Sequence, residues 1–245
     1  MKKNVSSKNL QSLYQNLDKL ESDFRNNNLY HLILCQIKGK TLLDIGAGVG
    51  HFVNKAVKKG LKAVGIEYDK ELISLGKKIY GNKLEVKNMD IEDIENITLK
   101  FENITMIDVL EHIKDDEKIL IKIKSKLEES GRLIILVPAN NYLYSKRDKN
   151  IGHYRRYSKN QLKSKLEKAG YKIIKIRYWN MLGFFPYLIF EKIFNKRISS
   201  NLRTKKEKSI AKKIIQYLIN LWLKYVEHNI NLGFGLSLLC VVEKK

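Results

Sequence analysis

From residue 41 to residue 137, short apolar runs alternate with longer amphipathic stretches, and this alternation restricts the chain to few folds. Short apolar runs predict buried strands, and apolar residues spaced three or four apart predict helices. Strands joined through helices run parallel, because each crossover returns the chain to the same edge of the sheet. The pattern therefore predicts an α/β fold: a doubly wound, mostly parallel sheet with helices on both faces.

The predicted elements can be placed by their flanking residues. Strands are predicted at Thr41–Ile45, Lys62–Glu67, Lys83–Lys87, Asn103–Asp108, Arg132–Val137, Tyr171–Tyr178 and Gly235–Val242. Helices are predicted from Gly50 to about Lys59, over Lys70–Tyr80, briefly after Asp90, over Asp115–Glu128 with Ser130 and Gly131 closing it, and from Ser158 to Gly170. A further amphipathic helix is indicated by Leu10, Leu13, Leu17 and Leu20.

The domain organisation follows from where this pattern stops. A chain of 245 residues suffices for one domain with an elaboration. We predict a single domain with an N-terminal helical cap at 1–40, a Rossmann-like core at 41–178 and 233–245, and a helical insertion at 179–232.

The segment from Leu42 to Gly50 carries the strongest functional signal. Glycines at a strand-to-helix turn let the backbone bend tightly and approach a ligand without a Cβ in the way. In open α/β sheets, ligands bind at this carboxyl end of the strands. A dinucleotide site needs glycine at the third position of G-x-G-x-x-G, where this chain has His51 after Gly46 and Gly48. The spacing therefore disfavours NAD.

Acidic residues follow the first three predicted strand ends in order. Asp44 precedes the turn, where it can orient the turn or accept from an ammonium group. Glu67 ends the second strand and can accept both hydroxyls of a ribose, while Tyr68 can cover an adenine face. Asp90 can accept from an adenine amino group, with the Ile91 amide beside it. Together these positions predict a nucleoside site.

These motifs resemble the class I S-adenosylmethionine-dependent methyltransferases, in the broad ubiquinone-biosynthesis-like (type 11/12) group. The segments that carry the resemblance are Leu-Leu-Asp-Ile-Gly-Ala-Gly-Val-Gly (42–50), Val-Gly-Ile-Glu-Tyr-Asp (64–69), Asn-Met-Asp-Ile (88–91), Met-Ile-Asp-Val-Leu-Glu-His-Ile (106–113) and Gly-Arg-Leu-Ile-Ile-Leu-Val-Pro (131–138). Two departures stand out: Glu67 where many relatives have Asp, and Ala47 where Cys is frequent.

The resemblance implies a fold, a cofactor and the residues that hold it. It implies a seven-stranded sheet in which Gly235–Val242 runs antiparallel between the fifth and sixth strands. It implies S-adenosyl-L-methionine as cofactor. The residues expected to bind it are Asp44, Gly46, Ala47, Gly48, Gly50, Glu67, Tyr68, Asp90, Ile91 and Asp108.

The region after the fourth strand bears on the methyl acceptor. Enzymes that methylate base amino groups resemble one another in an (Asn/Asp/Ser)-Pro-Pro-(Tyr/Phe) motif there, whereas this chain has Asp108-Val-Leu-Glu111. Carbon methylation of pyrimidines usually uses a Cys nucleophile, and neither Cys35 nor Cys240 falls near this edge. Both points disfavour nucleic acid as the acceptor. The apolar surroundings of the two cysteines predict buried free thiols.

Two histidines are candidate catalytic bases. His112 follows Asp108 and Glu111, although a helix-start residue bonded to backbone fits equally well. The resemblance implies that a Glu-His cluster can hold a divalent metal in related enzymes, but these residues alone do not establish one, and we assign no metal ligands. His153 lies in a loop beyond the fifth strand, where acceptor loops usually sit in this fold.

That loop also supplies the predicted substrate contacts. Similar His-(Tyr/Phe)-Arg-Arg-Tyr segments occur in methyltransferases that we associate with glycan or lipid-linked substrates. Arginine forks suit phosphate or carboxylate, so an anionic acceptor is plausible. The alternative is that these residues brace the loop. The predicted substrate-binding residues are Tyr154, Arg155, Arg156 and Tyr157.

The net charge of +21 is large, and it gathers in part within the insertion. Between Lys196 and Lys213 there are eight basic residues and one acid. Beside them, Ile210, Ile214, Leu218, Leu221 and Tyr225 form a helical stripe. Peripheral contact with an anionic membrane, a cap packed on the sheet and a dimer contact all fit this pattern. We predict a cytoplasmic protein, because no signal peptide or spanning segment is visible, with peripheral attachment to the inner membrane face as the extension.

Taken together, the sequence predicts an O-methyltransferase for a small hydrophobic or anionic acceptor, lipid-linked in one version. Two alternatives stay open: an RNA or protein methyltransferase that uses the basic surface, and a non-catalytic protein that only binds the cofactor.

Overall fold

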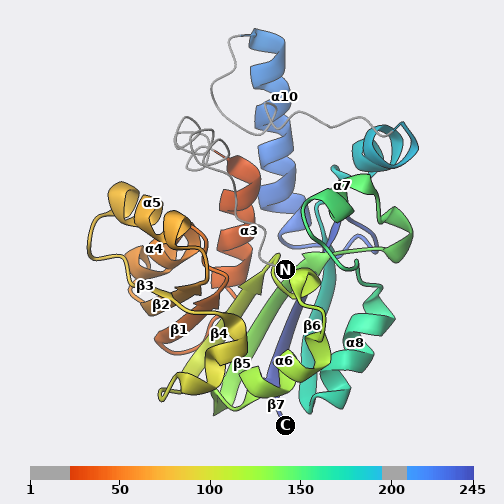
Figure 1. Cartoon of the computed structure of the whole chain (residues 1–245). Helices are drawn as coiled ribbons and strands as arrows, with labels where there is room; N and C mark the ends of the chain where they lie inside the picture. The colour runs from red at the N-terminus through yellow and green to blue at the C-terminus, as the bar shows by residue number, and fades with distance from the viewer. Residues whose placement is uncertain (1–22, 195–208) are drawn as a thin grey trace.

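The computed structural model describes residues 23–194 and 209–245, and its strands form one seven-stranded sheet in the order β3-β2-β1-β4-β5-β7-β6 (Figure 1). The strands are β1 (Thr41–Ile45), β2 (Lys62–Glu67), β3 (Val86–Asn88), β4 (Phe101–Ile107), β5 (Leu127–Pro138), β6 (Tyr171–Trp179) and β7 (Ser237–Lys244). Pairing is parallel from β3 through β5, and β7 runs antiparallel to both β5 and β6. The predicted fold class and the position of the last strand are confirmed.

Helices precede, connect and follow these strands. The α-helices are α3 (Phe24–Leu34), α4 (His51–Lys58), α5 (Lys70–Tyr80), α6 (Asp116–Lys124), α7 (Lys146–Asn150), α8 (Lys159–Lys168), α9 (Phe184–Pro186) and α10 (Ile210–Leu221). Tighter or wider helical turns are η1 (Ile91–Asn96), η2 (Leu110–His112), η3 (Asn141–Leu143), η4 (Tyr187–Ile193) and η6 (Trp222–Glu227). Side-chain caps fix several starts: Asp69 accepts from two amides of α5, and Ser158 accepts from the Gln161 amide of α8.

The apolar core lies on both faces of the sheet, as a three-layer α/β protein requires. On one face, strand residues pack against η1, α6 and α8, for example through Ile94, Leu120 and Leu166. On the other face they pack against α3, α4, α5 and η6, for example through Leu32 and Phe52. The strands are apolar on both sides because both faces are covered. The carboxyl ends of β1, β2 and β4 are thereby held at one edge.

Two predicted boundaries are wrong. The helix expected over Asp115–Glu128 ends at Lys124, and β5 already begins at Leu127, which pairs with Phe101 and is fully buried. Burial of Leu127 in the sheet outweighs continuation of the helix, and a register shift between Phe101 and Asn103 absorbs the following polar residues. The strand expected at Lys83–Lys87 forms only over Val86–Asn88, where the chain reaches β2.

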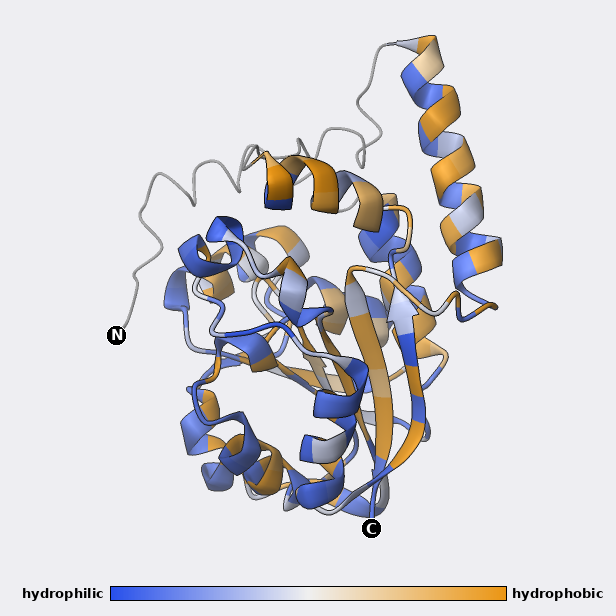
Figure 2. Ribbon diagram, turned by 90° about the vertical axis from the view of Figure 1, so that its right-hand side faces the viewer, coloured by the Kyte–Doolittle hydropathy of each residue, from blue (hydrophilic) through white to orange (hydrophobic). Residues whose placement is uncertain are grey.

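The helical segments between β6 and β7 differ from a packed cap. Helix α10 projects from the body of the protein, next to α3 at its base (Figures 1 and 2). Ile210, Ile214 and Leu218 of the predicted stripe are all more than half exposed. None of the described helices is both long and apolar enough to cross a bilayer. The stripe at Leu10–Leu20 lies outside the described residues.

The cysteines fit the prediction only in part. Cys240 is fully buried in β7, as expected. The prediction is wrong for Cys35, which is exposed as the C-cap of α3. Its apolar neighbours Leu32 and Ile33 turn toward the sheet, while the helical rotation carries Cys35 outward.

Candidate active site

The turn after β1 has left-handed backbone at all three glycines. Gly46, Gly48 and Gly50 have φ values of 71°, 55° and 75°. A Cβ on Gly46 would lie 2.5 Å from a methyl of Val109, and one on Gly50 would lie 2.7 Å from Leu84. A Cβ on Gly48 would meet nothing within 4 Å. Two glycines are therefore demanded by packing, and Gly48 leaves open space where a ligand can approach the backbone.

The turn is anchored to the end of β2. The amides of Gly46 and Ala47 both donate to the Ile66 carbonyl. Gly65 of β2 must lack a side chain, because a Cβ there would lie 2.6 Å from that of Ala47. Ala47 is therefore in a tight contact that favours a small residue.

Glu67 is buried at the carboxyl end of β2, facing the turn. One carboxylate oxygen accepts from the Gly48 amide at 2.9 Å, and the other accepts from the Asp69 amide at 3.1 Å. Each carboxylate oxygen can accept a further bond. Asn88 fixes this strand end by donating to the carbonyls of Glu67 and Tyr68. Asn88 had no predicted role, although it is the first residue of the Asn-Met-Asp-Ile motif.

Tyr68 and Asp90 lie next to Glu67 on the outer side of the site. Tyr68 is 59% exposed and can cover a ligand. Its pKa is raised by partial burial and by the charges of Glu67, Asp69 and Asp90, so these acids surround it. Asp90 caps η1 by accepting from the Glu92 amide, and Ile91 begins that turn. The structure thus brings the predicted ribose and adenine residues together.

Asp44 lies deeper, at the end of β1. It is 3% exposed and accepts a hydrogen bond of 2.7 Å from the Thr105 hydroxyl. Burial raises the pKa of Asp44 to about 7, the Thr105 bond opposes the rise, and Glu67 adds to it. A cationic partner, such as the ammonium group of a ligand, would stabilise the ionised form of a buried acid whose pKa is about 7.

Helix α3 brings two residues to this edge that the sequence did not indicate. Burial raises the pKa of Tyr30, and the charges of Asp44 and Asp108 add to this rise. Its ring packs on His51 and Phe52 of α4, with centroids 5.5 and 5.2 Å away. Arg25 is the second residue: its charge lowers the pKa of Asp108. No motif marks either residue, because α3 lies outside the βα units.

Asp108 follows β4 in a left-handed conformation, with φ of 54°. Its amide donates to the Leu136 carbonyl of β5. Part of the Asp108 surface is accessible. Exclusion of water by the surrounding protein nevertheless raises the pKa of Asp108, and the charges of Arg25, His153 and Arg156 oppose this rise only in part. A strained backbone at the end of a central strand is typical of functional sites. Since Val109 touches Gly46, this turn adjoins the glycine turn.

Glu111 is the most unusual group of the site. Its side chain is 0% exposed, and neither carboxylate oxygen has a hydrogen-bond partner within the described residues. Burial raises its pKa well above the usual range, and Asp108 raises it further. A buried acid without a partner is costly unless it serves a ligand or holds a proton. The sequence indicated Glu111 as a neighbour of His112 and as part of a Glu-His cluster that can hold a metal in related enzymes, but gave it no assigned role.

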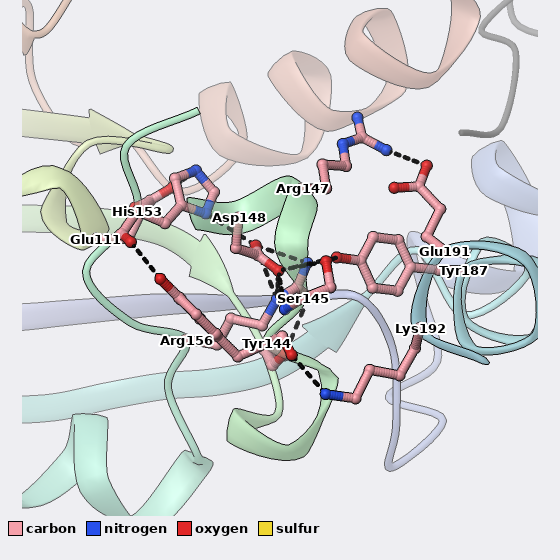
Figure 3. A network of polar contacts seen from close by, with 11 residues as sticks. Glu111, Tyr144, Ser145, Arg147, Asp148, His153, Arg156, Tyr187, Glu191 and Lys192 are labelled. Carbon is pink, nitrogen blue, oxygen red and sulfur yellow. Dashed lines mark hydrogen bonds and ion pairs between the residues drawn. The ribbon is translucent and has the colours of Figure 1, made fainter. Parts of the chain in front are cut away.

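His153 lies between two acids (Figure 3). Its Nδ1 is 3.0 Å from Asp148 Oδ1, and its Nε2 is 3.7 Å from Glu111 Oε1. Burial raises the pKa of Asp148, but bonds from His153 and Arg156 outweigh this and hold it well below its usual value. An ionised carboxylate only accepts, so Nδ1 carries the proton and Nε2 presents its lone pair.

Asp148 owes its position to a buried network (Figure 3). It accepts from the Arg156 guanidinium at 3.0 Å, from the Ser145 amide at 2.9 Å and from the Tyr187 hydroxyl at 2.9 Å. The Arg156 guanidinium also lies 4.5 Å from the centre of the Tyr187 ring. The loop that carries His153 is therefore fixed from several elements.

His112 lies beside His153 but differs in its contacts. The two rings meet edge to face, with centroids 4.6 Å apart. His112 is exposed and has a backbone hydrogen bond with Gly152. Burial of part of the ring and the neighbouring His153 lower the pKa of His112. The side chains of both predicted bases are therefore in contact.

The four predicted substrate residues fall into two groups. Tyr154 is exposed, and Arg155 is partly exposed while it pairs with Asp116 at 3.0 Å. Arg156 and Tyr157 are buried, with Arg156 on Asp148 and the Tyr157 hydroxyl donating to Asp116 at 2.8 Å. These two side chains brace the loop, as the alternative expected. Direct contact of either with an acceptor stays a prediction.

Glu111, His112 and His153 also fit a divalent cation. One donor atom from each lies within 4.8 Å of the others. The free oxygens of Glu111 and the imidazoles are suitable ligands for a borderline metal ion.

A hollow of about 500 Å³ lined by Lys70, Ser74 and Lys77 on α5 touches none of the site residues.

Comparison with known proteins gives a family and a fold. Residues 19–176 match the model of the methyltransferase domain family. The ubiquinone biosynthesis O-methyltransferase of Coxiella burnetii is 28% identical over 115 residues, 44% of this chain and 49% of that protein. The mitochondrial one of Schizosaccharomyces pombe is 25% identical over 125 residues, 49% of this chain and 43% of that protein. The chain thus spans about half the length of the curated relatives it matches.

A solved structure has the same fold over nearly the whole chain. The TehB-like SAM-dependent methyltransferase from Corynebacterium glutamicum has a TM-score of 0.60 at 17% identity, over 98% of both chains. The family match covers more than half of the chain, the sheet order is that of the predicted fold, and the glycine turn faces open space at the expected strand end. The chain belongs to the methyltransferase domain family.

Proposed function

We propose that this chain transfers the methyl group of S-adenosylmethionine to an oxygen of a small hydrophobic or anionic acceptor. The observation that carries the proposal is the pairing of His153 with Asp148, which directs the free Nε2 toward the buried Glu111 beside the end of β4. The distant O-methyltransferase relatives support oxygen as the acceptor atom.

The cofactor has a place for each of its parts. Glu67 holds the ribose, and Tyr68 and Asp90 hold the adenine together with the Ile91 amide. The glycine turn and Ala47 lie beneath the part of the cofactor that joins the ribose to the sulfur. Asp44 receives the ammonium group. Asp108 lies at the methyl end, between the turn and His153.

Methyl transfer needs alignment and the removal of one proton. Bound S-adenosylmethionine would supply the methyl group as an electrophile, with its thioether as the leaving group, and Nε2 of His153 would take the proton that the acceptor hydroxyl loses. The imidazolium that forms lies between Asp148 and Glu111, and the ionised Asp148 stabilises its charge. Glu111 can also bond the acceptor hydroxyl, because neither of its oxygens has a hydrogen-bond partner among the described residues.

The acceptor loop suggests an anionic group on the substrate. Tyr154 and Arg155 have accessible surface on the loop, while Arg156 and Tyr157 hold its shape. A guanidinium binds phosphate or carboxylate in a forked arrangement. His112, at the exposed side of His153, is the second candidate for the base.

A lipid-linked acceptor is the extension supported by the insertion. We infer that the chain works as one domain, with 179–232 as an insertion that contacts an anionic membrane. Large apolar side chains of this region are exposed, among them Phe185, Phe190, Phe194, Ile210, Ile214 and Leu218. The neighbouring sequence 196–213 has eight basic residues and one acid. Apolar and basic groups together suit a membrane interface.

A methyl-transfer assay tests the function. Purified protein and tritiated S-adenosylmethionine are added to cell extract, which is then separated into lipid, small-molecule, RNA and protein pools. The proposal expects label in the lipid or small-molecule pool. Label in RNA or protein would instead support the alternative that uses the basic surface. No label in any pool, despite tight cofactor binding, would support a non-catalytic binding protein.

The base is tested in the same assay with matched variants. His153→Gln should lower turnover about 100- to 10,000-fold and leave cofactor affinity nearly unchanged. Lys149→Gln, an exposed change in the same loop, serves as the control. If His112→Gln has the larger effect, His112 is the base. If chelation abolishes the turnover of the parent protein, the three donors at Glu111 act through a cation instead.

A further inference from the structure

A second group of metal-ligating side chains lies on the outer side of α3, away from the candidate active site. His31 is in the last turn of α3 and Cys35 is its C-cap residue. Four residues apart, they lie on the same side of the helix. His228 follows η6 and reaches the same place from the other end of the chain. The sequence separation of nearly 200 residues explains why no motif indicates this group.

The distances suit a common ion. His31 Nε2 and Cys35 Sγ are 3.9 Å apart, and the rings of His31 and His228 have centroids 5.2 Å apart. One donor atom from each residue lies within 4.8 Å of the other two. Tetrahedral zinc with bonds of about 2.0–2.3 Å has donors roughly 3.3–3.6 Å apart. Rotations of these accessible side chains can close the remaining distance.

The backbone on both sides of the group is held in place. The Arg177 guanidinium donates to the carbonyl of His228 at 2.8 Å and to that of Ile230 at 2.7 Å. The Asn28 amide of α3 donates to Asn220 of α10 at 2.8 Å. These contacts position His228 opposite α3 before any ion arrives. A site that is already formed binds with a smaller entropic cost.

We propose that His31, Cys35 and His228 bind a zinc-like transition-metal ion that joins α3 to the insertion. Thiolate and imidazole are the ligands that zinc prefers, and three of them leave a fourth position for water. The thiolate also supplies negative charge, which the site needs because Lys175 and Arg177 act on His228. Hard cations such as Mg²⁺ prefer oxygen ligands and should not bind.

The ion would stabilise a helix that also reaches the cofactor site. The same α3 presents Tyr30 and Arg25 to Asp44 and Asp108. A bound ion would tie the far side of this helix to His228 and resist its separation from the sheet. Metal binding should therefore raise the midpoint of thermal unfolding of the cofactor-free protein. This inference does not rest on the proposed methyl acceptor.

Cobalt titration of the chelator-treated full chain tests the site. Co²⁺ replaces zinc and gives an intense near-ultraviolet absorption when it binds a thiolate. The parent protein should show this absorption, and Zn²⁺ should abolish it by competition. Cys35→Ser should lose this absorption. His31→Ala and His228→Ala should each weaken Co²⁺ binding at least about tenfold, because loss of a residue that merely hydrogen-bonds to a metal ligand already costs that much affinity.

Two controls distinguish this site from other thiols and other metal ligands. Cys240→Ala removes the buried thiol and should keep the absorption. His112→Ala changes the group at Glu111 and should also keep it. The proposal is overturned if the parent binds Co²⁺ without thiolate absorption, or if Cys35→Ser retains it. Circular dichroism checks that each variant is folded, which the exposure of His31 and Cys35 favours.

Discussion

At the scale of single residues, the glycine turn and Glu67 act as one unit. Gly48 offers its amide to Glu67 and leaves the space beside its Cα open. Both features follow from residue type: glycine tolerates the left-handed backbone, and a carboxylate can accept from an amide and from a ribose hydroxyl together. The acid therefore holds the turn, and we propose that it also holds the sugar once the cofactor binds.

Replacement of Glu67 by Ala should weaken cofactor binding. The loss of a charge-assisted hydrogen bond to ribose costs about 1.5–3 kcal/mol, so the dissociation constant should rise roughly ten- to hundredfold for each of the two bonds lost. Isothermal titration calorimetry with S-adenosylhomocysteine measures the effect. Glu85→Ala, an exposed acid in the chain segment before β3, is the matched control. Equal affinities for both variants would remove Glu67 from the ribose site.

Asp44 should make stability depend on pH in one direction. Its folded pKa of about 7 lies above the ordinary value of 3.8, so the folded state binds the proton more tightly than the unfolded state does. The contribution of Asp44 to the free energy of unfolding is then fully present below about pH 4. It is lost as the pH rises to about 7, by at most about 4 kcal/mol. Asp44→Asn should remove this slope.

Denaturant unfolding of the ligand-free protein between pH 4 and 8 checks the prediction. The measured quantity is the difference in unfolding free energy between the parent and Asp44→Asn. That comparison matters because His51, whose pKa burial lowers to about 4, gives the opposite slope between about pH 4 and 6.5 in both proteins. A difference that does not change with pH would contradict the raised pKa of Asp44.

At the scale of elements, the loop between β5 and α8 is fixed by a buried network around Asp148. Arg156, Tyr187 and Ser145 all bond to Asp148, which in turn orients His153 (Figure 3). The sequence indicated a basic, aromatic acceptor loop but could not decide which of two adjacent arginines faces inward. That choice depends on where Asp148 and Tyr187 lie, and these contacts are made across distant segments.

The adjacent arginines should therefore differ in effect. Arg156→Ala leaves Asp148 as a buried charge without its main partner and should cost about 3–5 kcal/mol of stability. Arg155→Ala should cost no more than about 1 kcal/mol, because Lys165 and Tyr157 still bind Asp116. Thermal and denaturant unfolding measure both. Equal costs would contradict the bracing role, and a folded Arg155→Ala protein with a raised KM would support acceptor binding.

Helix α3 shows where prediction from sequence ends. The βα units could be predicted because their apolar periodicity and caps are local, and the resemblance supplied the place of β7. The boundary of α6 could not, since burial of Leu127 in the sheet decides it. Tyr30 and Arg25 enter the site through packing of α3 across the sheet, and no local signal records that packing.

At the scale of the whole molecule, exposed apolar side chains gather on the described part of the insertion. Figure 2 shows apolar residues along α10, which projects from the body, and the net charge of the chain is +21. Most of the stripe predicted on this helix is exposed, so it is free for another surface.

Anionic vesicles should bind the protein through this region. In a sedimentation assay, phosphatidylserine-containing vesicles should retain the parent, and neutral phosphatidylcholine vesicles should not. Ile214→Glu with Leu218→Glu should reduce binding, while Ile121→Glu, an exposed apolar position on α6, should not. If the double variant on α10 and the control variant on α6 both bind the vesicles like the parent, the apolar surface of α10 is not the membrane contact.

The central claim is that the carboxyl edge of β1, β2 and β4 holds the cofactor, and a crystal structure with S-adenosylhomocysteine tests it directly. The expected result is the ribose on Glu67, the adenine between Tyr68 and Asp90, and the sulfur directed toward Asp108. A nucleoside bound at another edge, or no bound nucleoside at saturating concentration, would contradict it.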